Sequence, residues 1–284
     1  MTKTLLTLVP TFALAALLAP ASAQAATLDV CASGCSYASI QAAVNAAAPG
    51  DVIDVQAGTY GRVAVSAGQD LTIEGHGQVT IDAGTAKSAV KVKAGAHLLL
   101  SGVTVTGVSG ATKNAAIINE GELDLDTVFV SNNDAMFGAI RNTGTLTMTD
   151  HCVVISNAST SYFAGGINNV GGIVDIELTT IFGNSGYNGG GASNLSGGEM
   201  HIQSTSIQAN DAYLGGGVHN SFGDLYIGSS VTFSDNYAQS LGGGWSNHNL
   251  GGEVLCALTS YLNNDTGSGQ SLDFYDVNGT CTPL

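Results

Sequence analysis

The 284-residue chain has few charged residues, and very few of these are basic. Lysine and arginine together occur 7 times against 22 aspartates and glutamates, which gives a formal net charge of −15 at pH 7. Nucleic-acid binding depends on cationic contacts to phosphate, so this composition excludes DNA and RNA as expected partners. Charged residues make up 10% of the chain and hydrophobic residues 44%, the reverse of a disordered sequence.

Proline is also scarce, with 4 residues against 39 glycines. A glycine-rich, proline-poor chain with many Thr, Val and Ile residues is typical of strands joined by tight turns. Beyond the N-terminal region no apolar run reaches the ~18 residues that a membrane-spanning helix needs. The sequence therefore predicts an all-β protein without a membrane span.

The N-terminus has the pattern of a secretory signal peptide. Lys3 precedes an apolar run from Leu5 to Leu18, and the small-residue sequence Ala21-Ser22-Ala23 offers a cleavage site. We assign residues 1–25 to this signal and expect a secreted or cell-surface protein. Export permits disulfides, and sequence position suggests the pairs Cys31–Cys35 and Cys256–Cys281, with Cys152 left over.

A repeat of about 26 residues runs through the second half of the chain. Each copy has a glycine-led tetrad ending in asparagine, at Asn119, Asn142, Asn169, Asn194, Asn220 and Asn247. A second asparagine follows in each copy, assigned to Asn132, Asn157, Asn184, Asn210, Asn236 and Asn263. Such self-similarity indicates a solenoid. Because an amide both donates and accepts hydrogen bonds, stacked asparagines are expected to form structural ladders.

Between the asparagines, apolar residues alternate with polar ones. The pairs are Leu123/Leu125, Leu146/Met148, Val174/Ile176, Met200/Ile202, Leu225/Ile227 and Val254/Cys256. A period of two indicates strands with one buried face. Three short strands per repeat predict a right-handed parallel β-helix of about ten coils. The segment Ser39–Ala47 reads as a short helix with one apolar face, a suitable N-terminal cap for the solenoid.

The predicted organisation is a single β-helix domain over residues 26–284. Within it we expect an N-terminal cap at 26–60, coils at 61–262 and a C-terminal tail at 263–284.

Two parts of the sequence resemble known β-helix families. The segment from Ser39 to Tyr60, with Pro49-Gly50-Asp51 and Gly58-Thr59-Tyr60, resembles the opening of pectin-lyase-like proteins. Gly165-Gly166-Ile167 and Phe233-Ser234-Asp235-Asn236 resemble the repeats of polymorphic outer-membrane proteins. The resemblance implies the fold. It specifies function poorly, because this scaffold carries lyases, hydrolases and adhesins.

Catalytic residues known from pectin-lyase-like enzymes have no clear counterparts here. Pectate lyases use a basic residue near calcium-binding aspartates, but Arg141 has no acidic cluster in the adjacent copies. Polygalacturonases would show an aspartate pair before a Gly-His-Gly motif, and Gly75-His76-Gly77 lacks that pair. We therefore assign no catalytic residue.

Two sets of residues are candidate binding sites. Glu199, Asp224 and Glu253 occupy equivalent positions in successive copies, where stacked carboxylates could hold calcium; a solvated acidic face is the alternative. An aromatic stripe is expected from loop residues that precede the glycine runs, namely Phe137, Tyr162, Phe163, Tyr187, Tyr213 and Tyr237. Aromatic faces suit the apolar faces of sugars, although packing between coils would also explain them.

The sequence favours a secreted or surface-displayed, non-catalytic β-helix protein that binds carbohydrate or a protein partner. The alternative is a polysaccharide-active lyase or glycoside hydrolase of the pectin-lyase-like group. Few basic residues and the missing acid pairs favour the first function.

Overall fold

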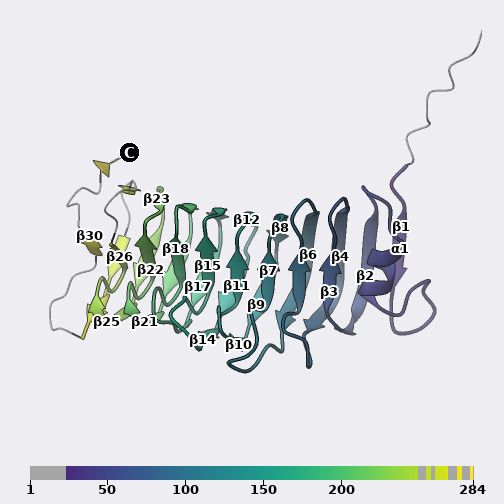
Figure 1. Ribbon diagram of the computed structural model, residues 1–284, viewed down its shortest axis with the longest axis horizontal. Helices are drawn as coiled ribbons and strands as arrows, with labels where there is room; N and C mark the ends of the chain where they lie inside the picture. The colour runs from purple at the N-terminus through teal and green to yellow at the C-terminus, as the bar shows by residue number, and fades with distance from the viewer. Residues whose placement is uncertain (1–23, 249–253, 257–259, 268–273, 277–281, 284) are drawn as a thin grey trace, which may run out of the picture.

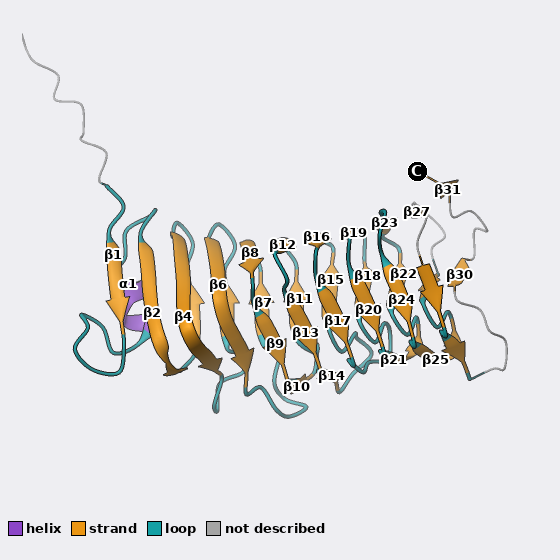
Figure 2. Ribbon diagram, turned by 180° about the vertical axis from the view of Figure 1, so that it is seen from behind, coloured by secondary structure: helices purple, strands orange, loops and turns teal. Residues whose placement is uncertain are grey.

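The chain forms an elongated parallel β-solenoid of about nine turns, which confirms the predicted fold class. The structure is a computed structural model and describes residues 24–248, 254–256, 260–267, 274–276 and 282–283. Successive turns stack along the long axis, with β1 near one end and β30 near the other (Figures 1 and 2). Residues 1–23, which make up most of the predicted signal peptide, lie outside the described residues.

Each turn of the solenoid has three main faces, and all of the strand pairings are parallel. The first face consists of β1 (Thr27–Val30), β2 (Val52–Tyr60), β4 (Asp70–Asp82), β6 (His97–Thr106), β8 (Glu122–Asp126), β12 (Thr145–Thr149), β16 (Ile173–Glu177), β19 (Glu199–Gln203), β23 (Asp224–Ile227), β27 (Val254–Cys256) and β31 (Thr282–Pro283). The second face, in the same 17-stranded sheet, adds β9 (Phe129–Ser131), β13 (Val153–Ile155), β17 (Thr180–Phe182), β20 (Ser206–Gln208), β24 (Thr232–Ser234) and β28 (Ser260–Leu262).

The third face is a separate nine-stranded sheet. Its strands are β3 (Val63–Val65), β5 (Val90–Val92), β7 (Ile117–Asn119), β11 (Ile140–Asn142), β15 (Ile167–Val170), β18 (Ala192–Leu195), β22 (Val218–Ser221), β26 (Trp245–Asn247) and β30 (Phe274–Asp276). Short strands in the loops before this face form two small ladders, made of β10 (Asp134–Ala135) with β14 (Ala158–Ser159), and of β21 (Asp211–Leu214), β25 (Tyr237–Leu241) and β29 (Asp265–Thr266).

The two halves of the solenoid turn the corner between the first and second faces differently. In the N-terminal half, β2, β4 and β6 each run through both faces, and the register of β4 shifts between Glu74 and Val79. From β8 onward the strand divides at a residue with a left-handed backbone, such as Thr127 (φ 54°) or Leu178 (φ 50°). The regular repeat seen in the sequence is therefore a property of the later turns.

The alternating apolar residues fill the interior, as the period of two predicted. Leu123, Leu146, Val174, Met200 and Leu225 are all fully buried. Helix α1 (Ile40–Ala46) covers the N-terminal end of this core with the predicted face, because Ile40, Ala43 and Val44 are buried. Its N-cap is Ser39, whose Oγ accepts a hydrogen bond from the Ala42 N–H (3.3 Å).

The first predicted asparagine ladder is present in full. Each side-chain amide donates to the carbonyl oxygen of the next asparagine, at distances from 2.8 to 3.0 Å, through Asn119, Asn142, Asn169, Asn194, Asn220 and Asn247. All six are buried. The side-chain amides also donate to backbone carbonyls, for example from Asn119 to Thr145. The ladder therefore also provides hydrogen-bond donors for backbone carbonyls at the turns between faces.

The second ladder was assigned wrongly at both ends. It runs through Asn133, Asn157, Asn184, Asn210, Asn236 and Asn264. The predicted members Asn132 and Asn263 each precede a ladder residue and adopt the left-handed conformation (φ 55° and 52°). The turn therefore takes its positive φ from the residue before the ladder, which is serine, glycine, alanine or aspartate in the other copies.

The cysteines agree with their expected pairing as far as the structure describes them. Cys31 and Cys35 form a disulfide, and Cys152 is free and buried. Cys256 ends β27, and Cys281 lies outside the described residues, so that pair stays a prediction. Among the described residues no helix is both long enough and apolar enough to span a membrane.

Candidate functional site

The loops before the third face bring most of the predicted aromatic residues together. The ring centroids are 5.0 Å apart for Tyr162 and Tyr187, and 4.8 Å apart for Tyr187 and Tyr213. Phe137 and Phe163 form a separate pair at 4.4 Å. These loops follow one another near β14, β21 and β25, along the lower edge of Figure 1.

Tyr237 departs from the predicted stripe. Tyr237 is the register partner of Asp211, in the part of the β21–β25 pairing that precedes the register shift, so it does not lie level with Tyr213. Gln239, further along β25, lies near the tyrosines instead. The offset is visible in the sequence, because Tyr237 directly follows Asn236, whereas Tyr187 and Tyr213 each come three residues after Asn184 and Asn210.

The three tyrosines line a groove of about 610 Å³, here called the tyrosine groove. Its walls come from four successive turns and consist of Ser159, Thr160, Ser161, Tyr162, Ser185, Gly186, Tyr187, Asp211, Ala212, Tyr213 and Gln239. Burial raises the pKa of the Asp211 carboxyl above its ordinary value. Tyr162 is the most exposed of the rings at 68%, compared with 37% for Tyr187 and 39% for Tyr213. The groove thus combines aromatic surface with hydroxyl, amide and carboxylate groups.

A buried polar row under these loops holds them in place. Asn168 accepts a hydrogen bond from the Ala164 N–H (2.7 Å) and donates to the carbonyl oxygen of Phe137 (2.6 Å). The hydroxyl of Ser193 donates to Asn168 (2.9 Å). The glycine runs let the loops pass close by, since a Cβ on Gly189 (φ 82°) would collide with the carbonyl oxygen of Ala192.

The same row ends in a histidine–serine pair. His219 Nδ1 and Ser246 Oγ are 2.8 Å apart. Burial, together with the nearby His248, lowers the pKa of His219 to about 3. A base hydrogen-bonded to a serine can activate a nucleophile, but these side chains are 3% and 0% exposed. The pair is therefore closed to a polymeric substrate and acts as a structural contact.

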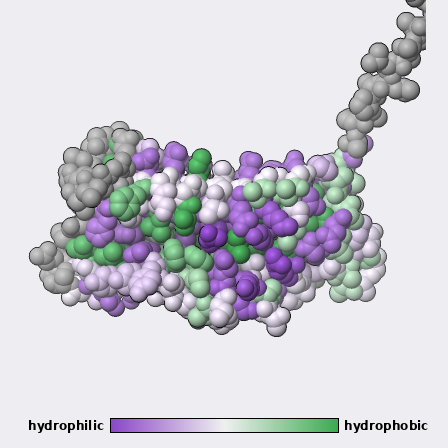
Figure 3. Space-filling model, viewed as in Figure 1, coloured by the Kyte–Doolittle hydropathy of each residue, from purple (hydrophilic) through white to green (hydrophobic). Residues whose placement is uncertain are grey.

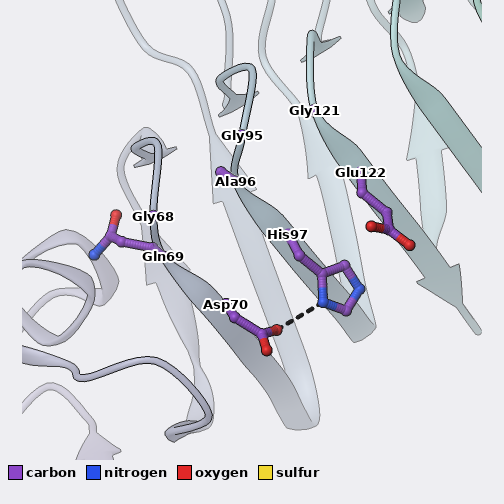
Figure 4. A pocket seen from close by; sticks show the side chains of 8 residues that line it. All are labelled: Gly68, Gln69, Asp70, Gly95, Ala96, His97, Gly121 and Glu122. Atoms are coloured by element: carbon purple, nitrogen blue, oxygen red, sulfur yellow. Dashed lines mark hydrogen bonds and ion pairs between the residues drawn. The ribbon is translucent and has the colours of Figure 1, made fainter.

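A second group of polar residues lies on the first face at the N-terminal half. His97 contacts Asp70 through Nδ1 (2.7 Å), and Glu122 lies beside them (Figure 4). The Nε2 atom of the same ring contacts Asp124 (2.9 Å). Burial alone would lower the pKa of His97, but hydrogen bonds and charge from Asp124 and Asp70 raise it above its ordinary value. The residues flank a depression of about 610 Å³.

This histidine cluster is the arrangement closest to a metal site among the described residues. One ligand atom from each of His97, Glu122 and Asp124 lies within 4.8 Å of the others. A protonated His97 accounts for the same geometry by bridging two carboxylates. Sequence reasoning missed the cluster because the early turns lack the asparagines that aligned the later ones.

The predicted calcium column is present only in part. Glu199 and Asp224 are register partners on β19 and β23, while Glu253 lies outside the described residues. Glu199 pairs with Nε2 of His201 (3.0 Å), and Asp175 pairs with Nδ1 of the same ring (2.6 Å). Asp175 and Glu199 thus both pair with His201, and calcium binding by the column stays a prediction.

Arg141 lies outside both acidic groups. Its guanidinium carbon is 4.9 Å from the centre of the Phe137 ring, a cation–π contact.

On the face of the molecule drawn in Figure 3, hydrophilic and hydrophobic residues alternate in small patches rather than in one broad apolar surface.

Comparison with known proteins identifies the fold. A pectin methylesterase from Aspergillus niger, in a penultimately deglycosylated form, is similar with a TM-score of 0.56 and 15% identity, over 93% of each chain. Its deglycosylated form has a TM-score of 0.54, with the same identity and coverage. The fold is that of pectin-lyase-like β-helix proteins.

More distant likeness extends to pectin methylesterase PemA from Erwinia chrysanthemi, with a TM-score of 0.41 and 10% identity over 72% of this chain and 79% of that one. No family model and no curated protein matches the chain. At these identities the likeness concerns the fold alone, and the chemistry must be argued from this chain's own residues.

Proposed function

We propose that this chain is an exported, non-catalytic β-helix protein that binds carbohydrate in the tyrosine groove. The observation that carries the proposal is the concave surface where Tyr162, Tyr187 and Tyr213 stand beside hydroxyl, amide and carboxylate groups. Amphipathic tyrosines offer apolar surface and a polar tip, and sugars present both apolar C–H faces and hydroxyls. A small set of polar groups on an aromatic wall is the usual composition of a ligand site.

Carbohydrate is favoured over a protein partner by the shape of the site. A volume of about 610 Å³ falls within the range of roughly 300–1,000 Å³ found for small-ligand sites. Stable protein interfaces are instead broad surfaces of about 800 Å² per partner. A groove made by serial loops of a solenoid suits a narrow, linear ligand better than a globular one.

Export is supported by the N-terminal sequence and by one disulfide. The pattern around Lys3 and the following apolar run is that of a signal peptide. The Cys31–Cys35 disulfide fits an oxidising compartment. Both observations point to a protein that works outside the cytoplasm.

The second candidate function is a polysaccharide-active enzyme. The observation in its favour is the histidine cluster, where carboxylate oxygens of Glu122 and Asp124 lie within 4.8 Å of each other beside a depression. Two close carboxylates are the arrangement that retaining glycosidases use. Against it, Asp124 already pairs with His97, and a carboxylate held in this way is less available as a nucleophile or base.

One experiment separates these functions. The mature protein is screened on a glycan array with and without calcium, while soluble polysaccharides are incubated with it and assayed for new reducing ends and unsaturated products. Binding without product supports the proposal. Product formation that is lost in Glu122→Gln would replace the proposal with the enzymatic function. Binding of a protein partner without binding of any glycan would replace it with a protein-binding role.

Two variants connect binding to the groove. Tyr162→Ala is expected to lose most of the binding signal. Phe222→Ala removes another exposed aromatic ring (61% exposed), at the turn between β22 and β23, outside the groove lining. Equal loss in both variants would show that binding does not take place in the groove.

A further inference from the structure

The part of the chain that builds the tyrosine groove carries no positive side chain. Residues 142–284 contain 11 aspartates and glutamates and no lysine or arginine. The nearest basic residue in sequence, Arg141, is stacked on Phe137 and is not part of the groove lining. A carboxylate-bearing polymer that enters this region therefore meets repulsion with no compensating ion pair.

Within the groove itself, Asp211 is the one charged side chain of the lining. No hydrogen bond or ion pair to its carboxylate is formed by the described part of the chain. An ionised carboxylate can only accept hydrogen bonds, so it selects a ligand that donates. Asp211 is exposed at the surface of the groove, so a ligand there can reach its carboxylate.

The remaining polar groups are neutral and suit hydroxyls. Thr160, Ser161 and Ser185 present hydroxyl-bearing side chains and Gln239 presents an amide, whereas the Ser159 hydroxyl already donates to the carbonyl oxygen of Met136 (2.9 Å). Each can donate or accept a hydrogen bond. Together with Asp211 they match a ligand that carries many hydroxyls and no negative charge.

The groove is long enough for several linked sugars. Its lining residues come from four successive turns, at Ser159–Tyr162, Ser185–Tyr187, Asp211–Tyr213 and Gln239. Three steps of strand spacing at ~4.8 Å give a length of roughly 14 Å. A linear oligosaccharide lying along the solenoid axis would contact all four turns, whereas a single sugar would contact only one or two.

We infer that the tyrosine groove takes an uncharged, hydroxyl-rich polysaccharide rather than a polyuronate, with Asp211 accepting hydrogen bonds from the sugar hydroxyls. This inference rests on the proposed carbohydrate binding and specifies its ligand.

The test compares charged and uncharged polymers on the full mature protein. Affinity electrophoresis is run in gels containing a β-glucan, a xylan, polygalacturonate, alginate or chitosan, at about 0.05 M and 0.5 M salt. Retardation is expected in at least one uncharged polymer, with little change between the two salt concentrations. Polyuronates are expected to cause none at either concentration.

Two variants with the same change of charge show whether Asp211 is responsible. Asp211→Asn is expected to weaken binding of the uncharged polymer by about tenfold, since hydrogen bonds to a charged group contribute more than neutral ones. Asp235→Asn makes the same change at an exposed turn with φ 54°, which asparagine tolerates, and is expected to leave binding unchanged.

The outcomes distinguish a failure of this inference from a failure of the proposed carbohydrate binding. Retardation by polygalacturonate or alginate, or by chitosan alone, would overturn the inference and leave carbohydrate binding in place. Equal effects of the two variants would remove Asp211 from the site. No retardation by any polymer, for a protein with the melting behaviour of a folded chain, would overturn carbohydrate binding itself.

Discussion

The rings of Tyr187 and Tyr213 stack on each other, with centroids 4.8 Å apart and planes inclined by 18°. Stacked rings cover each other's faces and leave their edges and hydroxyls toward solvent. Tyr162 meets Tyr187 edge-on, at 78°, and is far more exposed. The sequence predicted one aromatic stripe, but the structure divides it into two packed pairs, Phe137 with Phe163 and Tyr187 with Tyr213, and leaves Tyr162 as the most exposed ring of the groove.

This division predicts different effects for Tyr162 and Tyr213. Tyr162→Ala is expected to reduce glycan affinity by about tenfold or more, as truncation of an exposed aromatic anchor commonly costs over 1 kcal/mol. Tyr213→Ala is expected to lower the free energy of unfolding by about 0.5–1.5 kcal/mol through the lost stacking, with a smaller effect on affinity. Calorimetric binding and urea unfolding of both variants would check this, and the reverse ranking would assign the binding face to Tyr213.

The second asparagine ladder gives a stability prediction. Asn133 is 1% exposed, and its side-chain amide donates to Asn157 (3.0 Å) and to the backbone carbonyl of Ser131. Asn133→Ala would leave buried partners unsatisfied, and is expected to cost about 1–3 kcal/mol. Asn132→Gly is the matched control, because Asn132 is exposed with φ 55° and glycine adopts this conformation freely. Urea unfolding should separate the two variants; equal losses would contradict the assignment of the ladder.

The sequence predicted the solenoid because its repeat combines two independent signals. Alternation such as Leu146/Met148 sets which face is buried, and the spacing of Asn142 and Asn169 sets the length of a turn. The prediction placed each end of the second asparagine ladder one residue too early, at Asn132 instead of Asn133 and at Asn263 instead of Asn264. Either asparagine satisfies the spacing of the repeat, and only the hydrogen bonds decide between them.

The candidate sites were less predictable from the sequence for a related reason. Tyr237 was grouped with the other tyrosines although it directly follows Asn236, so it lies level with Asp211 rather than Tyr213. His97 lies on β6, and the early strands β4 and β6 lack the sequence repeat of the later turns. The sequence therefore offered no pattern that placed His97 beside Asp70 or Asp124 before the strand register was known. Patterns identified the repeated parts of the molecule, whereas each site depends on contacts that occur once.

The histidine cluster predicts a stabilisation that is lost at high pH. The carboxylates of Asp124 and Asp70 raise the pKa of His97 above its ordinary 6.5, so folding favours the protonated ring. The contribution is complete below about pH 6.5 and disappears as pH rises through the higher, folded-state pKa. His97→Gln is expected to lower the free energy of unfolding by roughly 0.5–1 kcal/mol at pH 5.5, the scale of an exposed ion pair, and by much less at pH 9.

His151→Asn serves as the control for that comparison. His151 lies at an exposed turn with φ 67°, which asparagine accepts, and replacing it leaves the His97 cluster intact. Urea midpoints of the three proteins at the two pH values give the result. A His97→Gln difference that is the same at pH 5.5 and pH 9 would show that His97 contributes through packing rather than charge.

His219 predicts the opposite dependence on pH. Its folded-state pKa of about 3 lies far below the ordinary 6.5, because the ring is buried and His248 lies nearby. The unfolded chain therefore takes up a proton that the folded chain refuses. Stability is unaffected above about pH 6.5 and falls as the pH decreases toward 3, by an amount on the order of a few kcal/mol.

Two variants test this dependence. In His219→Gln, the fall in the free energy of unfolding with decreasing pH should become less steep, although the variant is less stable at neutral pH. Ser246→Ala removes the hydrogen bond but keeps the titrating ring, so it should retain the wild-type slope. Urea unfolding from pH 7.5 to 4 measures the slopes, and an unchanged slope in His219→Gln would move the acid sensitivity to other groups.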